Sequence, residues 1–149
     1  MVAPVYVANN FLRRGKDEGI EITPLKLQKL VYFLYKEYLK QTGEPLFSEQ
    51  FETWKYGPVV PSIYTEFNSC GSCAIKGFAI DSQGKSYIVR ETGVFAECIE
   101  KIWSAYKYCS GETLSSLTHR EGTAWTKAKE KKARFLSDDD IRIEANLIV

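Results

Sequence analysis

A segment between Thr23 and Gly43 constrains the fold most, because it is apolar over most of a helical circumference. Thr23-Pro24 is a helix start signal, since a hydroxyl can cap the first turn and proline suits the first helical position. Gly43 is a typical residue at a helix end. Apolar side chains recur at helical spacing and extend beyond a single stripe: Leu25, Leu27, Leu30, Val31, Tyr32, Phe33, Leu34, Tyr35, Tyr38 and Leu39. The pattern predicts a central helix that leaves only these residues for solvent: Lys26, Gln28, Lys29, Lys36, Glu37 and Lys40.

Further helices are predicted on both sides of this segment. One begins at Pro4, runs to about Arg14 and is closed by residues 15–19. A second long helix covers about residues 93–109, and shorter ones carry Leu114 and Leu117 or begin near Thr123. A final helix is expected after Ser137, where a run resembling a capping box precedes Ile141, Ala145 and Ile148.

Residues 51–64 predict a strand, a stiff corner and a helix. Residues 51–54 are bulky and suit a short strand, which Gly57-Pro58 should end because proline has no N–H for a ladder. Pro61 suits the first turn of a following helix. Residues 74–80 and 86–90 predict two more strands joined by a turn at 81–84. The predicted class is α+β: one mainly helical domain over residues 1–149 with a small antiparallel sheet of about three short strands.

Composition narrows the function classes. The chain has 149 residues and a formal net charge of +1, so neither nucleic acid nor an acidic substrate is indicated as a partner. No apolar run approaches the roughly twenty residues of a membrane span. The first residues, Met-Val-Ala-Pro-Val-Tyr, lack the pattern of a signal peptide, so we expect a cytoplasmic location. A glycine-rich phosphate loop and a recognition-helix signature are also missing from the sequence.

The four cysteines leave three interpretations open. Cys70 and Cys73 form a C-x-x-C pair, whereas Cys98 and Cys109 lie about 16 Å apart along a predicted helix and cannot bind one ion together. The pair could be structural, a metal half-site or a redox dithiol. We expect no metal or other cofactor, and no disulfide in a reducing cytoplasm.

His119 is the only histidine and the main candidate for catalysis. It could act as a general base toward Ser115 or Ser116, but the three residues lie close together on one predicted helix and no carboxylate is evidently placed to orient the ring. A hydrogen-bonded helix-end histidine and a partner contact are the alternatives. A nearby basic cluster is diluted by acidic residues and favours a solvated helix face: Lys127, Lys129, Lys131, Lys132 and Arg134. These residues indicate an interaction module and not an enzyme.

Three segments together resemble one family, and they span most of the chain. They are residues 23–33, residues 51–64 with the core Trp54-Lys-Tyr-Gly-Pro-Val-Val-Pro61, and Leu114-Ser-Ser-Leu-Thr-His119 followed by Trp125. In order and spacing they resemble the Panacea domain of SocA-like antitoxins and phage-associated proteins. Two mild departures are Ala124, where many members have proline, and Thr53, where alanine is usual.

The resemblance implies a cytoplasmic bacterial antitoxin that neutralises a cognate toxin by direct protein–protein binding. One alternative is a proteolytic adaptor that delivers the toxin to an AAA+ protease, or a phage-encoded regulator that binds a host protein. An adaptor or regulator of this kind would need an exposed docking tail, and residues 144–149 could be this tail or simply the last core helix. A second alternative is a hydrolase that uses His119.

The partner is predicted to bind at the corner formed by Gly57, Pro58, Val59 and Val60, because a rigid turn presents apolar groups at low ordering cost. Tyr56 and Tyr64 flank this corner and could serve as aromatic anchors. His119 and Arg120 are predicted to lie on the same side. A further set is expected to pack in the interior as structural motif residues: Leu27, Leu30, Trp54 and Trp125.

Overall fold

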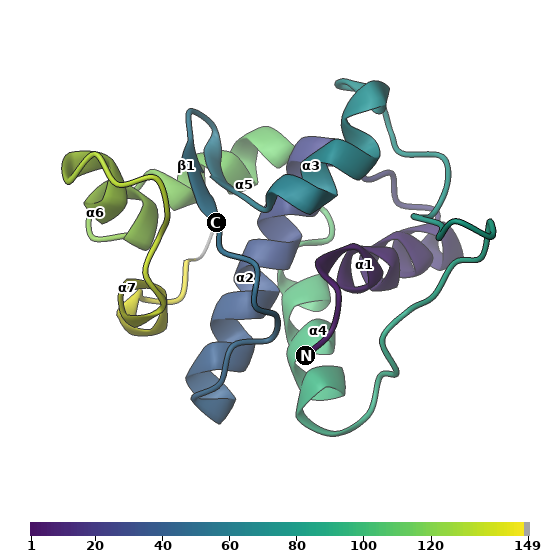
Figure 1. Cartoon of the computed structure of the whole chain (residues 1–149), viewed down its shortest axis with the longest axis horizontal. Helices are drawn as coiled ribbons and strands as arrows, with labels where there is room; N and C mark the ends of the chain where they lie inside the picture. The colour runs from purple at the N-terminus through teal and green to yellow at the C-terminus, as the bar shows by residue number, and fades with distance from the viewer. Residues whose placement is uncertain (148–149) are drawn as a thin grey trace.

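The long helix α2 runs through the middle of the molecule, and the other elements surround it (Figure 1). The structure is a computed structural model that describes residues 1–147. Its elements in chain order are α1 (Pro4–Glu18), α2 (Pro24–Thr42), β1 (Glu52–Trp54), β2 (Gly57–Val59), α3 (Pro61–Phe67), the 3₁₀ helix η1 (Asn68–Cys70), α4 (Gly93–Tyr106), α5 (Gly111–Thr118), α6 (Ala124–Glu130) and α7 (Asp138–Ile143). The α+β class and its mainly helical character are confirmed. No helix of the described residues is long and apolar enough to cross a membrane.

The ends of α2 are confirmed, but the prediction for its polar face is wrong. The Thr23 hydroxyl accepts a hydrogen bond from the Lys26 amide at 3.2 Å, and Gly43 ends the helix with a φ of 75°. Most of the side chains expected in solvent are buried: Lys26, Gln28, Lys29, Lys36 and Glu37. They are covered because α2 contacts α1, α3, α4, α5, α7 and β2, so neighbouring elements enclose nearly its whole circumference.

The prediction that Gly57-Pro58 ends a strand is wrong. These two residues lie inside the second strand of a hairpin. Thr53 pairs with Pro58 across the hairpin, and residues 55 and 56 make the turn. The Thr53 amide points away from Pro58 and donates to the Arg134 carbonyl at 2.9 Å. Thr53 and Pro58 therefore occupy a position where antiparallel strands exchange no hydrogen bonds, so proline's missing N–H costs nothing there.

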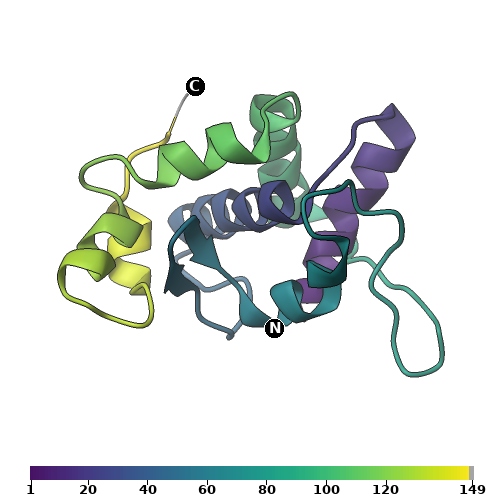
Figure 2. The same cartoon turned by 90° about the horizontal axis from the view of Figure 1, so that it is seen from above.

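The predicted strands at 74–80 and 86–90 are absent from the described residues, and the sheet has two strands. Side-chain hydrogen bonds from two asparagines of α1 take the place of the predicted strand pairing. Asn9 bonds both the amide and the carbonyl of Ala79, and Asn10 does the same for Val89, at 2.7 to 3.0 Å. The predicted turn is present, since the Asp81 amide donates to the Lys85 carbonyl at 2.8 Å. The segment lies along α1 as a loop (Figure 2).

Several predicted helix ends also need correction. Helix α1 continues past Gly15 to Glu18, and Gly15 is required there because a Cβ would lie 2.7 Å from the Ile20 carbonyl oxygen. Helix α4 ends at Tyr106, before Cys109. Helix α7 ends at Ile143, so Ala145 lies beyond it, and Ile148 falls outside the described residues.

The expectation of no disulfide is wrong as well, because the structure joins Cys70 to Cys73. Cys98 and Cys109 carry free thiols.

A buried ion pair fixes the C-terminal segment to α2. Lys36 donates to the Glu144 carboxylate at 2.7 Å, and both side chains are at most 4% exposed. The same carboxylate accepts from the Tyr32 hydroxyl and from the Ala124 amide, each at 2.8 Å. It thus connects the central helix, the start of α6 and the chain after α7.

Candidate functional site

Three successive carbonyl groups at the tip of the hairpin accept hydrogen bonds from side chains of α5, α6 and the segment between them. The Trp54 carbonyl accepts from the Trp125 indole at 2.7 Å. The Lys55 carbonyl accepts from His119 Nε2 at 2.9 Å, and the Tyr56 carbonyl from the Ser115 hydroxyl at 2.5 Å. We call this arrangement the hairpin clamp. It joins two segments that lie far apart in the sequence.

His119 is fully engaged in the clamp. Its Nδ1 atom lies 2.7 Å from the Ser115 carbonyl oxygen, its Nε2 atom faces the Lys55 carbonyl, and its ring packs on Trp125 with centroids 4.0 Å apart. Each ring nitrogen therefore faces a carbonyl oxygen, and Nδ1 also lies 3.4 Å from the Thr118 hydroxyl oxygen. The Ser115 and Ser116 hydroxyls donate to other carbonyls, those of Tyr56 and Thr113. No ring nitrogen is aimed at a hydroxyl of either serine, so the geometry supports the helix-end interpretation and not the hydrolase.

Helix α2 holds the second strand from the other side. Lys29 Nζ donates to the Pro58 carbonyl at 2.7 Å, and the Gln28 amide both donates to and accepts from the Val60 backbone. Gly57 has a φ of 111°, and a Cβ there would lie 2.5 Å from the Thr118 hydroxyl oxygen. Only glycine fits this position.

The predicted surface corner is therefore an internal element. Gly57, Pro58, Val59 and Val60 are all buried, so they cannot meet a partner as an exposed turn. Leu27, Leu30 and Trp125 are buried, as their predicted packing role requires, but Trp54 of the same predicted set is only half-buried and lines a surface groove. Gln28 and Lys29 were predicted to face solvent and Ser115 was named only as a possible nucleophile, so none of the three was predicted to hold the hairpin. The available signal was their position: all three are polar residues inside or beside the segments that carry the family resemblance.

Lys29 is an ionisable side chain buried without a carboxylate partner among its hydrogen bonds. Burial lowers the pKa of Lys29 from its ordinary value of 10.5 to about 7. Below that value the lysine is charged in both states, and the folded state bears the full desolvation cost. Between the two values only the unfolded chain binds the proton, so stability should rise with pH.

We expect this lysine to make the wild-type protein roughly 2 kcal/mol more stable at pH 9 than at pH 7. Lys29→Met removes the titrating group, so this part of the pH dependence should disappear from urea unfolding curves measured across the same range. Lys131→Met is the matched control, because Lys131 is exposed, and it should keep the wild-type slope. An unchanged slope in Lys29→Met would show that Lys29 stays charged in the folded protein.

An apolar groove lies beside the hairpin and has a volume of ≈ 420 Å³. We call it the aromatic groove. Tyr56 and Tyr64 line this groove and are 61% and 44% exposed. The Trp54 ring packs against the Tyr64 ring, and the ring centroids are 4.7 Å apart. Its lining residues are Pro24, Leu25, Gln28, Trp54, Lys55, Tyr56, Val59, Ile63, Tyr64, Phe67 and Gly71. Lys55 is the one charged residue of this lining. His119 and Arg120 do not line it, although the former bonds the turn that carries Tyr56.

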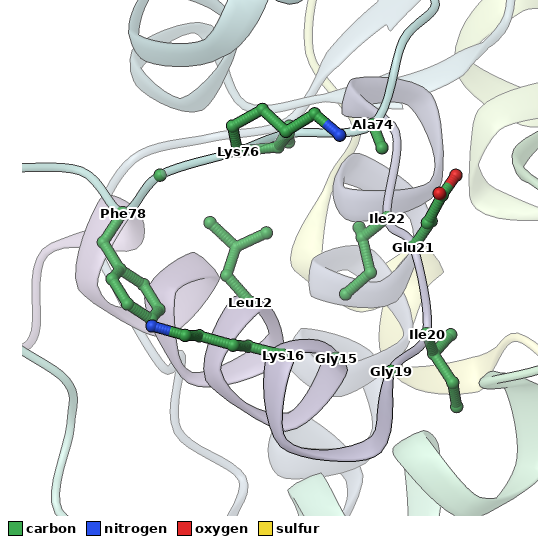
Figure 3. Close-up of a pocket in the computed structure, with 12 residues that line it drawn as sticks. Leu12, Gly15, Lys16, Gly19, Ile20, Glu21, Ile22, Ala74, Lys76 and Phe78 are labelled. Atoms are coloured by element: carbon green, nitrogen blue, oxygen red, sulfur yellow. The ribbon is translucent and has the colours of Figure 1, made fainter.

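A second pocket of ≈ 400 Å³ lies between the end of α1 and residues 74–78. Leu12 and Ile22 point into it, and Lys16 stretches toward Phe78, with its Nζ 5.8 Å from the ring centroid (Figure 3). Its lining includes the charged side chains Lys16, Glu21 and Lys76 but no serine, cysteine or histidine. Within residues 1–147, no group of three or more His, Cys, Asp or Glu side chains is placed to hold a metal ion.

Comparison with known proteins identifies the family of the chain. The chain matches the family model described as "Antitoxin SocA-like, Panacea domain" over residues 27–126, a range that contains the whole hairpin clamp. It is 34% identical over 125 residues to Antitoxin SocA of Caulobacter vibrioides (strain NA1000 / CB15N). That alignment covers 80% of this chain and 66% of the relative, just under two thirds of its length. No solved structure matches the chain significantly. The chain belongs to the SocA-like antitoxin family that carries the Panacea domain.

Proposed function

We propose that this protein neutralises a cognate toxin by binding it directly, with no catalytic step. The observation that carries the proposal is the pair of exposed tyrosines beside a hairpin whose tip is fixed by three side-chain hydrogen bonds. Family membership supplies the toxin as the kind of partner. The one histidine is committed to holding the hairpin, which supports binding over hydrolysis.

The proposed contact surface is the aromatic groove with Tyr56 and Tyr64 as its anchors. Tyrosines are strong interface residues because they bury a large area at a low entropy cost. The clamp lowers that cost further, since the turn is already ordered before binding. Gly57–Val59 and Val60 act as the buried support of this surface. We propose Arg120, which is exposed after α5, as a charged contact at the edge of the interface.

Co-expression with the gene encoded beside this one tests the proposal. The neighbouring product alone should arrest growth, and this protein should restore it. Growth arrest that persists in the presence of the folded protein would contradict toxin neutralisation for this pair. Partner half-life separates an inhibitor from a protease adaptor, because only an adaptor shortens it in a protease-dependent way.

The C-terminal segment favours the inhibitor. Glu144 and Leu147 are buried, and the Leu147 carbonyl accepts a hydrogen bond from the Tyr106 hydroxyl. The segment is therefore anchored to the body at Glu144 and Leu147, with Ala145 and Asn146 exposed between them, and residues 144–147 do not form a free docking tail. The remaining part of the proposed tail, residues 148–149, lies outside the described residues.

The double variant Tyr56→Glu/Tyr64→Glu should weaken toxin binding by at least about 30-fold in calorimetric titration, the effect expected for losing a hot spot. Both side chains are exposed, so the variant should remain folded. Tyr108→Glu is the matched control, since Tyr108 is 83% exposed and does not line the groove. Wild-type affinity in the folded double variant would place the interface elsewhere.

A further inference from the structure

The segment Cys70-Gly-Ser-Cys73 forms a tight turn directly after α3. Gly71 has φ 66° and ψ −124°, the conformation of the first central residue of a type II′ turn. The Cys73 amide donates to the Cys70 carbonyl at 3.3 Å, which closes such a turn. The two Cα atoms are 5.6 Å apart, within the usual range for a disulfide. The backbone therefore places the two cysteines for bonding, and the structure joins them.

This pair is open to reagents in solution. Gly71, Ser72 and Cys73 are exposed, and Cys70 is half-buried. Cys98, in contrast, is completely buried, and burial raises the pKa of its thiol to about 11. Exchange requires an accessible sulfur, and exposed disulfides are in general the labile ones. Cys109 is half-buried and has no cysteine partner, so the C-x-x-C turn is the site where dithiol–disulfide exchange should occur in the folded protein.

The turn also borders the aromatic groove. Gly71 lines the groove together with Phe67 and Tyr64 of α3, and η1 connects that helix directly to Cys70. On the other side of the turn, the Ile75 amide donates to the Ile22 carbonyl at 2.9 Å. The cross-link thus closes a short loop that is attached to the body at both ends. Opening it should loosen the groove at Gly71.

We propose that Cys70 and Cys73 form a reversible dithiol–disulfide site that exchanges with low-molecular-weight thiols such as glutathione, and that the disulfide holds the rim of the aromatic groove. In the opening reaction a thiolate attacks one sulfur and forms a mixed disulfide, while the other cysteine leaves as a thiolate and takes up a proton. A second thiol resolves the mixed disulfide. Two thiols are oxidised to one external disulfide, and Cys70 and Cys73 receive the two electrons and two protons. Oxidised glutathione reverses the sequence.

Alkylation of the folded protein in glutathione buffers tests the chemistry. In the Cys109→Ser background, protein held with oxidised glutathione should take up no label, and protein held with millimolar reduced glutathione should be labelled at Cys70 and Cys73. Cys98 should react only after denaturation. Failure to label the pair under reducing conditions, or full labelling under oxidising conditions, would overturn the proposal.

Gly71→Ala should shift the glutathione equilibrium about tenfold toward the dithiol, because alanine is strained at this backbone conformation. Gly84→Ala is the matched control, since Gly84 also has a positive φ, of 77°, but lies in another turn. The control should leave the equilibrium unchanged. An equal shift in both variants, or none in Gly71→Ala, would show that the turn does not set the reactivity of the pair.

The indole N–H signals of the tryptophans test the link to the groove. Trp54 lines the groove, whereas the Trp103 indole bonds Glu18 at 2.6 Å on α1. Reduction should shift the Trp54 signal and leave that of Trp103 in place, and Cys70→Ser/Cys73→Ser should show the shifted position under all conditions. A Trp54 signal at the same position in the oxidised and reduced protein would contradict the proposal that the disulfide holds the rim of the aromatic groove. These measurements use the protein without toxin, so their outcome is independent of the proposed function.

Discussion

Glu144→Ala is expected to lower the free energy of unfolding by about 3–5 kcal/mol, the usual cost of removing one member of a buried ion pair. The Glu144 residue is 2% exposed, and its carboxylate accepts from Lys36, Tyr32 and the Ala124 amide. Alanine leaves the lysine charge uncompensated and two further donors without their acceptor. Urea unfolding followed by circular dichroism measures the change.

Asp139→Ala is the matched control, because Asp139 pairs with Arg142 at 3.7 Å but its side chain is 92% exposed. It should change stability by less than about 1 kcal/mol. Replacing the pair by Lys36→Met/Glu144→Leu should recover part of the loss, since no lone charge then remains in the interior. Equal, small effects of Glu144→Ala and Asp139→Ala would show that Glu144 is solvated in solution.

Gly57→Ala is expected to destabilise the protein by about 3 kcal/mol, from overpacking and backbone strain together. A Cβ would lie 2.5 Å from the Thr118 hydroxyl oxygen and 2.9 Å from Lys29 Cε, at a φ of 111°. Relief requires movement of the hairpin away from α5 or α2, which breaks the clamp. Toxin binding should fall with stability, because the turn carrying Tyr56 loses its support.

The variant Gly84→Ala separates the backbone strain at a positive φ from the steric clash that alanine causes at Gly57. Gly84 also has a positive φ, of 77°, but a Cβ at this position would have nothing within 4 Å, so this variant should cost only about 1 kcal/mol. The difference between the two variants reports the close approach at the clamp. Similar losses in both would mean that the hairpin has room to shift at Gly57.

The sequence predicts the helices of this fold well, because their signals are local. Thr23-Pro24 and Gly43 set the ends of α2 through cap geometry that neighbouring residues determine. Strand pairing and burial depend on distant partners. The segments at 74–80 and 86–90 have strand-like composition, but they do not pair with each other, and Asn9 and Asn10 of α1 bond the backbone of Ala79 and Val89 instead. Lys29 looks solvent-exposed in a helical pattern and becomes buried only because β2 and α5 cover it.

The candidate site was predicted only in part, because its burial also depends on partners that lie far away in the sequence. Aromatic residues near a glycine–proline corner indicate a shaped surface, and Tyr56 and Tyr64 are indeed exposed. Which side of the corner faces outward depends on the bonds from His119 and Lys29, whose partners lie 64 and 29 positions away. A single sequence does not reveal such pairings. The corner itself was therefore assigned to the surface when it is buried.

Titration of purified toxin activity with increasing amounts of this protein tests the central claim most directly. Neutralisation by binding predicts inhibition in proportion to the added protein, reached at once and complete only when the toxin is saturated. Tyr56→Glu/Tyr64→Glu should require a much higher concentration for the same inhibition, while Tyr108→Glu should behave as wild type. A small fraction of an equivalent that abolishes all toxin activity over time would reveal turnover, and would contradict direct, non-catalytic neutralisation.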